Sequence, residues 1–421
     1  MTPVVSARAK KSTDIVAKIS MLNSPSLDSV DCGGFVTLSW QGMHRFLEYA
    51  RSVEASVIGE IRAMAECESP SDDPAAVNRF VDLIAARVEG MADVQTFPGG
   101  PFGRHMRCEF QLPGTKNDGQ ILALGHSDTV WPLGTLAHMP FRQADGRLWG
   151  PGVLDMKSGI AFFLAAMRML RELDVPVRRR IVLQLNADEE VGSDSSRALT
   201  EEAAARSIAV LVLEPGTGMT GKLKTARKGV GDYSVTVQGR ASHAGVDFEA
   251  GASAIVELAR QVERIAGFTD LRRGLTVNPG VIRGGTRTNV VAAEARVDVD
   301  IRVARVKDAA WLEKKFRSLK PVDKRCSIAV EGGLNRPPME RSAGIRKLFK
   351  TARGLAAGLG VDLEESSTGG GSDGNFTAGL GIATLDGLGG VGEGAHAVNE
   401  SILVDRIADR TALLALLACS L

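Results

Sequence analysis

The segment IVLQLNADEE (residues 181–190) decides the fold class of this chain, because an apolar run of strand length leads into three consecutive acidic residues. Three other segments repeat this pattern: residues 121–124 precede Gly125 and His126, residues 208–213 precede Glu214, and residues 382–385 lead through a glycine-rich loop to His396. Continuous apolar strands between helices predict an α/β fold with a mostly parallel sheet covered on both faces. Ligands of such sheets bind beyond the carboxyl ends of the strands, where these polar residues lie.

Apolar residues at helical spacing flank the strands. From about residue 37 we expect two amphipathic helices, the first with Phe46, Leu47, Val53, Val57, Ile61 and Met64, and the second with Val77, Phe80, Val81, Ile84 and Val88. A further helix is expected to open at Asp155 and to carry Ile160, Phe163, Leu164, Met167 and Leu170.

Residues 229–338 have a different pattern, in which apolar and polar residues alternate along the strands. Residues 296–303 alternate strictly, and the expected order of elements is β-α-β-β-α-β. This order predicts a ferredoxin-like α+β insert. The chain is therefore divided into a tail (1–36), a first part of the main domain (37–228), the insert (229–338) and a second part of the main domain (339–421).

Composition excludes several classes of function. The net charge of the 421 residues is +1, so no strong field favours nucleic acid or an anionic membrane. No run of 18 apolar residues predicts a membrane span, and the N-terminus lacks a clear signal peptide, which predicts a cytoplasmic protein. The five cysteines are scattered without a CxxC pair, so neither a disulfide framework nor a thiolate zinc site is expected.

Five residues suit a hydrolytic centre with two divalent metals: His126, Asp155, Glu190, Glu214 and His396. Imidazole nitrogen and carboxylate oxygen are the ligands that zinc takes besides thiolate, so two Zn²⁺ per chain are expected, with Co²⁺ or Mn²⁺ as alternatives. Each residue alone has a simpler interpretation, such as a packed histidine, a helix N-cap or a loop carboxylate. Their joint occurrence in this order favours the metal centre.

Two neighbours add chemistry to this set. Glu189 emerges beside Glu190 from the edge of the core, so one carboxylate can bind metal while the other takes a proton from water. Asp128 follows His126 by two residues and can hold the other ring nitrogen. Two metals would polarise a scissile carbonyl and lower the pKa of water to roughly 7. Delivery of the proton to a leaving amine then implies an amide or peptide substrate.

The motifs GHSDTV, GVLDMKSG, NADEEVGS, LEP, ASHAG, TRTNVV, DIR, TGGGSDGN and GAH occur in this order over residues 50–421. Together they resemble the M20 metallopeptidase family, in particular its glutamate carboxypeptidase (carboxypeptidase G2-like) branch. The family fold is a two-zinc catalytic α/β domain interrupted by a lid and dimerisation domain, which agrees with the insert at 229–338. The tail at 1–36 has no counterpart in the family pattern.

The resemblance implies a role for each residue. His126 and Glu214 would bind one metal, Glu190 and His396 the other, with Asp155 bridging. Glu189 would be the general base and Asp128 the orienting carboxylate. His243 of the lid would reach the active site of a partner subunit and stabilise the oxyanion, which implies a homodimer.

The same resemblance implies substrate contacts, each with a structural alternative. Asn289, Arg302 and the backbone of Gly371 would meet the carboxyl end of a small N-acyl amino acid or peptide substrate. Arg302 shares its strand face with acidic residues, so a salt bridge explains it equally well. Lys222 and Arg336 are candidates for an acidic side chain of the substrate or for solvated surface.

Three functions stay open from the sequence. The first is an exopeptidase that releases a C-terminal amino acid, with glutamate as the leading candidate. The second is an N-acyl-amino-acid deacylase or a dipeptidase of the same fold, which the same metal centre would serve. The third is a binding protein without activity, which the complete ligand set and Glu189 disfavour.

Overall fold

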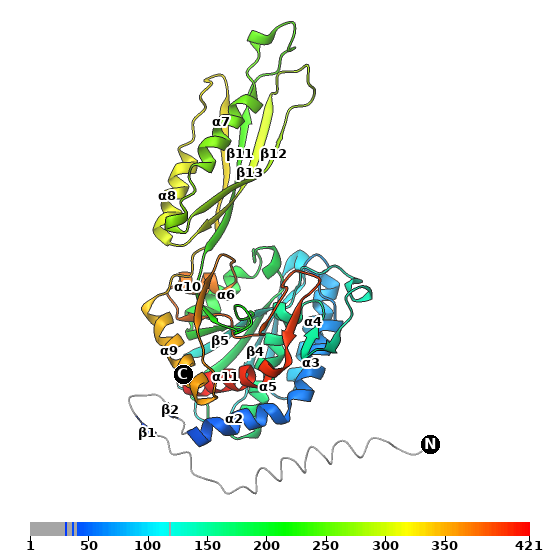
Figure 1. Cartoon of the computed structure of the whole chain (residues 1–421), viewed down its shortest axis with the longest axis vertical. Helices are drawn as coiled ribbons and strands as arrows, with labels where there is room; N and C mark the ends of the chain where they lie inside the picture. The colour runs from blue at the N-terminus through cyan, green and yellow to red at the C-terminus, as the bar shows by residue number, and fades with distance from the viewer. Residues whose placement is uncertain (1–29, 32–35, 38–39, 118) are drawn as a thin grey trace.

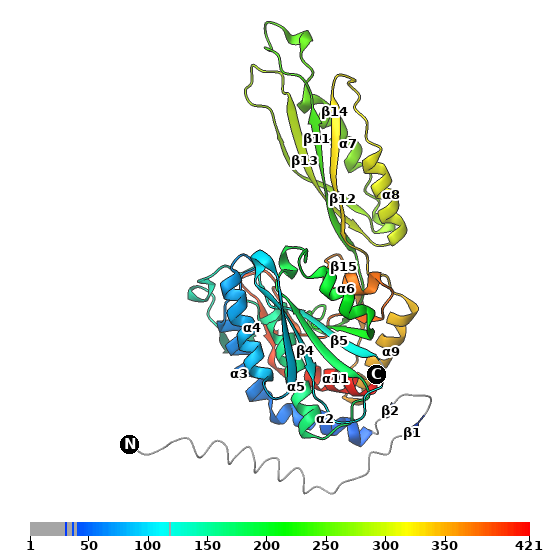
Figure 2. The same ribbon diagram turned by 180° about the vertical axis from the view of Figure 1, so that it is seen from behind.

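The computed structural model describes residues 30–31, 36–37, 40–117 and 119–421, so the predicted tail lies mostly outside the described residues. The chain forms a large α/β body and a smaller elongated lobe that stands on it (Figures 1 and 2). Two short strands, β1 (Val30–Asp31) and β2 (Val36–Thr37), pair antiparallel.

The body is built on a six-stranded sheet with the order β16-β9-β5-β8-β4-β3. Its parallel part comprises β16 (Thr384–Leu385), β9 (Ser207–Val212), β5 (Gln120–His126) and β8 (Arg180–Asn186). The remaining strands, β4 (Arg104–Phe110) and β3 (Ala92–Pro98), run antiparallel at the other edge. The prediction of a mostly parallel α/β sheet is confirmed, although the antiparallel edge was not foreseen.

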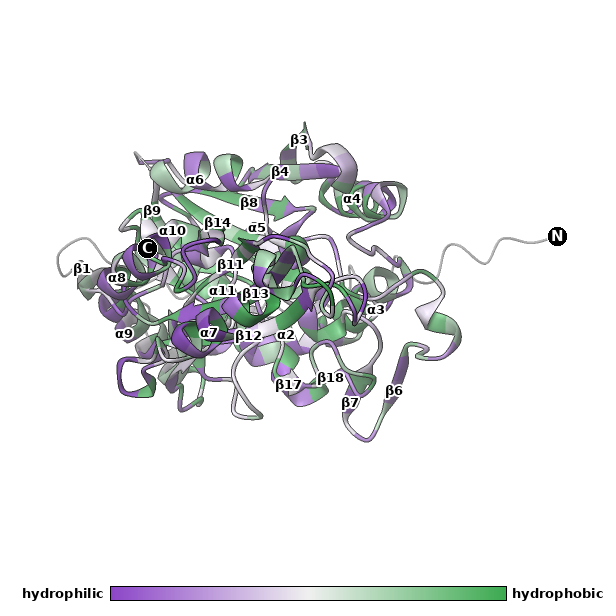
Figure 3. Ribbon diagram, turned by 90° about the horizontal axis from the view of Figure 1, so that it is seen from above, coloured by the Kyte–Doolittle hydropathy of each residue, from purple (hydrophilic) through white to green (hydrophobic). Residues whose placement is uncertain are grey.

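Helices cover both faces of this sheet, as its continuous apolar strands require. Ile121 and Ile181 pack with residues of α5 (Ser158–Glu172) and α11 (Ile407–Ser420), whereas Leu122 and Val182 pack against α6 (Arg197–Ala205) on the opposite face. Figure 3 shows β8 as hydrophobic in this buried position.

Residues 40–66 form two helices where the sequence predicted one. α2 (Trp40–Ser52) ends at Ser52, whose hydroxyl donates to the carbonyl of Tyr49 (2.7 Å), and α3 (Glu54–Glu66) follows. A side chain that bonds to the preceding turn competes with the backbone for that acceptor. The apolar face predicted for this region is buried all the same except for the partly buried Val53, and that of α4 (Pro74–Val88) is buried throughout.

Smaller elements complete the body. The strands β6 (Arg142–Ala144), β7 (Arg147–Trp149), β17 (Gly392–Glu393) and β18 (Ser401–Leu403) form an antiparallel sheet with the order β17-β18-β7-β6. The pairing of β18 with β7 brings the loop 394–400 beside residues 150–155. Near the lobe lie β10 (Leu223–Arg227) parallel to β15 (Glu365–Thr368), together with α9 (Ala343–Gly358) and α10 (Gly374–Gly379).

The lobe contains four strands and two α-helices in the order β-α-β-β-α-β: β11 (Gly229–Gln238), α7 (Ala254–Ala266), β12 (Thr276–Gly284), β13 (Glu294–Val303), α8 (Val306–Arg317) and β14 (Ser327–Arg336). The strands form an antiparallel sheet with the order β12-β13-β11-β14. Alternate residues such as Val235, Val297 and Val299 are buried in a core of their own, shared with α7 and α8. We propose the boundaries 37–228, 229–338 and 339–421 on this basis.

None of the described helices has both the length and the apolar content needed to cross a lipid bilayer. Among the described cysteines, Cys67, Cys108, Cys326 and Cys419 are free thiols.

Candidate active site

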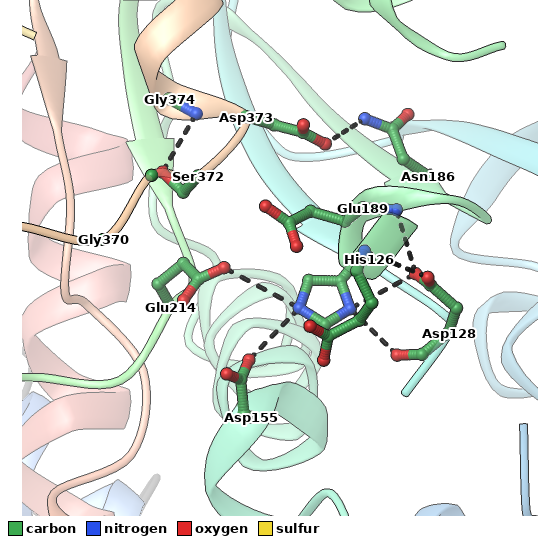
Figure 4. Close-up of polar contacts among 12 residues, drawn as sticks. His126, Asp128, Asp155, Asn186, Glu189, Glu214, Gly370, Ser372, Asp373 and Gly374 are labelled. Carbon is green, nitrogen blue, oxygen red and sulfur yellow. Dashed lines mark hydrogen bonds and ion pairs between the residues drawn. The ribbon is translucent and has the colours of Figure 1, made fainter. Parts of the chain in front are cut away.

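Three strands of the parallel sheet deliver carboxylates and a histidine to one edge. His126 is the last residue of β5, Glu189 and Glu190 lie in the short helical turn Glu189–Val191 after β8, and Glu214 lies two residues beyond β9. Because parallel strands share one carboxyl edge, the side chains converge although up to 88 positions separate them (214 − 126 = 88). Figure 4 shows Glu189 and Glu214 directed toward the imidazole of His126.

Asp155 joins this group from the turn before α5. The prediction that Asp155 opens the helix is wrong by three residues, because α5 begins at Ser158 and the backbone of Asp155 is not helical (φ −115°, ψ 96°). Its Oδ1 lies 3.2 Å from His126 Nε2, and its Oδ2 lies 3.4 Å from His396 Nε2. One carboxylate thus presents each of its oxygens to a different imidazole, which is the arrangement required of a bridging ligand.

The other two carboxylates, those of Glu214 and Glu190, each lie near one of the same imidazoles. Glu214 Oε1 lies 3.7 Å from His126 Nε2, and Glu190 Oε2 lies 3.3 Å from His396 Nε2. Two groups therefore form, one with His126 and Glu214 and the other with His396 and Glu190, and Asp155 lies between them.

The donor set fits a pair of divalent cations. Two overlapping trios, His126 with Glu189 and Glu214 and His126 with Asp155 and Glu190, have donor atoms within 4.8 Å of one another. Glu190 Oε1 is buried and has no hydrogen-bond partner among the described residues. Since a buried carboxylate oxygen without a partner is costly, this atom favours a bound cation. Nitrogen and carboxylate donors of this kind suit zinc.

The carboxylates also impose a strongly negative field on the two histidines. Burial lowers the pKa of His126, but hydrogen bonds with Asp128 and Asp155 outweigh it and raise the pKa well above its usual value. Hydrogen bonds to Asp155 and Glu190 raise the pKa of His396 to about 10. The same negative field would attract a metal cation.

Asp128 orients both the histidine and the acidic turn. Its backbone carbonyl lies 2.9 Å from His126 Nδ1, and its carboxylate Oδ1 lies 3.4 Å away. Because the carbonyl can only accept, Nδ1 carries the proton and Nε2 is free to bind a metal. The Asp128 carboxylate also accepts hydrogen bonds from the backbone nitrogens of Glu189 and Glu190 (both 3.2 Å) and from Ser71 (2.7 Å).

Glu189 is held by Arg336, which comes from the last position of the lobe strand β14. One guanidinium nitrogen donates to the Glu189 carbonyl (2.9 Å) and lies 3.1 Å from its Oε1, while another donates to Asp373 Oδ1 (2.6 Å). Burial raises the pKa of Glu189 well above its usual value, and Arg336 opposes that shift. A carboxylate with raised proton affinity is suited to take a proton from water.

A second buried arginine lies beside Glu214. Arg227 makes two 2.8 Å hydrogen bonds to Asp386, donates to the carbonyl of Gly371 (2.7 Å), and lies 3.5 Å from Glu214 Oε2. Burial raises the pKa of Glu214 to about 7, and Arg227 opposes that rise. The sequence analysis missed Arg227, Asp386 and Asp373. The TGGGSDGN motif contains Asp373, but only the backbone of Gly371 in that motif was expected to have a role.

The basic residues proposed for substrate binding already have carboxylate partners. Lys222 forms a 2.8 Å ion pair with Glu364 at the surface. Arg302 makes two hydrogen bonds with Asp300 on the polar face of β13 (3.0 and 2.8 Å). Arg336 is buried between Asp373 and Glu189, so its contacts favour positioning of Glu189 over direct contact with a substrate.

His243 and Asn289 lie together but away from this centre. The backbone nitrogen of Ala244 donates to the carbonyl of Asn289 (3.0 Å), in loops beyond the far end of β11. The ten residues of β11 extend about 30 Å from the body at the usual strand rise, as Figure 1 illustrates. The two residues are therefore not brought to the metal-ligand set of their own chain.

Comparisons with known proteins identify the family of this chain. The model of peptidase family M20/M25/M40 matches residues 122–420. The chain is 30% identical over 355 residues to carboxypeptidase G2 of Pseudomonas sp. (strain RS-16), covering 82% of this chain and 84% of that relative. It is 32% identical over 310 residues to succinyl-diaminopimelate desuccinylase of Cereibacter sphaeroides (strain KD131 / KCTC 12085), covering 67% of this chain and 78% of that relative.

A solved structure shares the fold. Aminopeptidase PepT from Bacillus cereus ATCC 10987 superposes with a TM-score of 0.72 at 23% identity, covering 87% of this chain and 98% of that one.

Proposed function

Because this chain belongs to peptidase family M20/M25/M40 and is therefore a hydrolase, we propose that it is a dinuclear zinc exopeptidase that releases a C-terminal amino acid. The observation that carries the proposal is the placement of Asp155, whose two oxygens face two imidazoles. We propose His126 and Glu214 as ligands of one metal, Glu190 and His396 as ligands of the other, and Asp155 as the bridge.

We propose a separate role in catalysis for each of the residues around Glu189. Two divalent metals, when bound, would polarise the scissile carbonyl and make water more acidic. Glu189 takes a proton from water and then delivers it to the departing amine, because its carboxylate lies beside the proposed ligands and has raised proton affinity. Arg336 and Asp128 fix the backbone of Glu189 during both transfers.

A substitution at Glu189 tests the assignment. Glu189→Gln removes the proton acceptor and keeps the shape, so turnover should fall by at least about a hundredfold while two metals still bind. The matched control is Glu190→Gln at the adjacent position, which should lose metal. If Glu189→Gln hydrolyses at the wild-type rate, the proposed base is wrong.

We propose glutamate as the leading candidate for the released amino acid, on the similarity to carboxypeptidase G2. The second candidate is an N-acyl-amino-acid deacylase, which the similarity to a desuccinylase supports, and a dipeptidase uses the same chemistry. A panel of N-acyl glutamates, other N-acyl amino acids and dipeptides distinguishes them. A preference for an acidic leaving residue would support the first candidate, and a preference for another N-acyl amino acid or a dipeptide would support the second.

We also propose a homodimer formed through the lobe. His243 lies far from the metal-ligand set of its own chain, and Val246, Phe248 and Ile282 expose 83%, 66% and 60% of their surface on the same lobe. A partner subunit that covers this surface would bring its own His243 to the first subunit's active site. Sedimentation at micromolar concentration tests the dimer, and a fully active monomer would contradict it.

A further inference from the structure

Glu400 is a fully buried carboxylate that receives four hydrogen bonds, three from the backbone of residues 152–155 and one from Trp131. Its Oε1 accepts from the backbone nitrogens of Leu154 (2.8 Å) and Asp155 (3.0 Å). Its Oε2 accepts from the backbone nitrogen of Gly152 (2.9 Å) and from the indole nitrogen of Trp131 (2.7 Å). The carboxylate therefore attaches the loop 394–400 to the turn that carries Asp155.

The local backbone explains why a carboxylate is stable there. Gly152 has φ +71°, a left-handed conformation that glycine adopts without strain, and the nitrogens of residues 152, 154 and 155 converge on one point. Convergent backbone N–H groups form an anion-binding nest that offsets the loss of hydration of a buried charge. The carboxylate of Glu400 is thus the anion that these backbone N–H groups bind.

The same loop carries His396, four residues before Glu400. His396 has φ +61°, which a residue with a side chain adopts only when its surroundings hold it there. Its Nε2 lies 3.4 Å from Asp155 Oδ2. Glu400 thus joins two loops that each carry a proposed metal ligand, His396 in one and Asp155 in the other. Loss of that junction would let the two loops move apart.

We infer that Glu400 is a positioning residue of the metal centre, which fixes the separation of Asp155 and His396 and thereby sets the affinity of the metal between them. The inference rests on the metal centre proposed above. Glu400 acts through backbone hydrogen bonds, since both of its oxygens are already occupied by the nest and Trp131.

Glu257 in the lobe provides a matched control, because a purely structural carboxylate would affect stability alone. It is also fully buried, and its oxygens accept hydrogen bonds from the backbone nitrogens of Val322 (2.9 Å) and Asp323 (3.0 Å) and from Gln261 (2.7 Å). Glu257→Gln and Glu400→Gln each replace one oxygen with an amide nitrogen that faces donors. Both should lower the melting temperature, and only Glu400→Gln should change metal binding.

The experiment measures zinc affinity by competition with a chromophoric chelator, and the absorption spectrum of the Co²⁺-loaded full chain. Glu400→Gln should bind one of its two metals about 10–100-fold more weakly than wild type, as is usual when a group that supports a metal ligand is lost. The cobalt spectrum should also change. Glu257→Gln should match wild type in both measurements.

The outcomes separate this inference from the proposed function. If the wild-type chain binds no metal, the proposed centre itself fails. If wild type binds two metals and Glu400→Gln binds them with unchanged affinity and spectrum, the positioning role is wrong. Should Glu400→Gln not fold, Glu400→Asp decides in the same assay, because it keeps the charge and is too short to span the junction. Weaker binding supports the role, and wild-type binding overturns it.

Discussion

Replacing Asp373 by asparagine tests whether the buried network around Arg336 supports catalysis. Asp373 accepts hydrogen bonds from Arg336 (2.6 Å), from Asn186 (2.6 Å) and from the hydroxyl of Ser193. All three neighbours donate, so the amide nitrogen of an asparagine would face a donor whichever way it turned. The substitution therefore removes both the charge that balances Arg336 and at least one hydrogen bond.

The structure sets the size of the effect. Breaking a buried ion pair costs about 3–5 kcal/mol, and the lower end applies here because Arg336 keeps Glu189 Oε1 at 3.1 Å. The unfolding free energy should thus fall by about 3 kcal/mol. Arg336 would also draw Glu189 toward itself, away from the proposed metal ligands. A general base contributes about 10²–10⁴-fold, so its partial displacement should lower kcat about 10–100-fold with little change in KM.

The assay combines urea unfolding with kcat and KM on the best substrate of the panel. The pH profile adds a direction: burial raises the pKa of Glu189 and Asp373 raises it further, so Asp373→Asn should lower it and move the acid limb of kcat to lower pH. Asp308→Asn in the lobe is the control, since Asp308 is buried and paired with Arg273 far from the site. It should lose stability and keep kcat. A wild-type kcat in Asp373→Asn would refute the reasoning.

Three further outcomes are expected. Zinc binding should release protons and should strengthen as the pH rises toward about 10. The reason is that hydrogen bonds to Asp155 and Glu190 raise the pKa of His396 to that value, and zinc must displace the proton. Calorimetric titration in buffers of different ionisation enthalpy measures the number of protons released. For the same reason the metal-free chain should lose stability as the pH rises from about 6.5, the pKa of a histidine in the unfolded chain, to about 10, the pKa of His396 in the folded chain. Urea unfolding measures the free energy of unfolding across that range. A constant free energy of unfolding would contradict the raised pKa of His396. The third outcome concerns His243→Ala and Glu189→Gln chains, each inactive alone, that are mixed and allowed to exchange subunits. The mixture should regain about a quarter of wild-type activity, because about half of the dimers contain one chain of each kind and each such dimer has one intact site. If subunits exchange and no activity returns, His243 does not act in the partner's site.

The sequence was sufficient to predict where the proposed ligands gather, because the physics behind that prediction is local. Apolar runs of strand length define parallel strands, and parallel strands share one carboxyl edge. His126, Glu190 and Glu214 follow such runs and do meet at that edge. The strands β3 and β4 were missed for the converse reason, since polar residues such as Gln95 in β3 and Arg107 in β4 leave no continuous apolar run.

The supporting network could not be predicted, because each contact joins residues that are distant in sequence. Arg336 is 147 positions from Glu189, and Glu400 is 245 positions from Asp155. In the sequence, an isolated arginine or glutamate in a loop has the composition of solvated surface. The start of α5 was misplaced for a similar reason: apolar spacing identifies the helix, whereas the non-helical segment before Ser158 contains the left-handed Gly152 and is bonded by the distant Glu400.

The two arginines together explain how the lobe is attached to the chemistry. Arg227 lies two residues before β11 and Arg336 ends β14, so each stands at one of the two places where the chain passes between body and lobe. Each is fixed by its own aspartate of the body, Asp386 or Asp373. Each then lies within 3.5 Å of a carboxylate oxygen of the candidate site, Glu214 for Arg227 and Glu189 for Arg336. Both connections between body and lobe therefore carry a buried arginine that contacts a carboxylate of the candidate site.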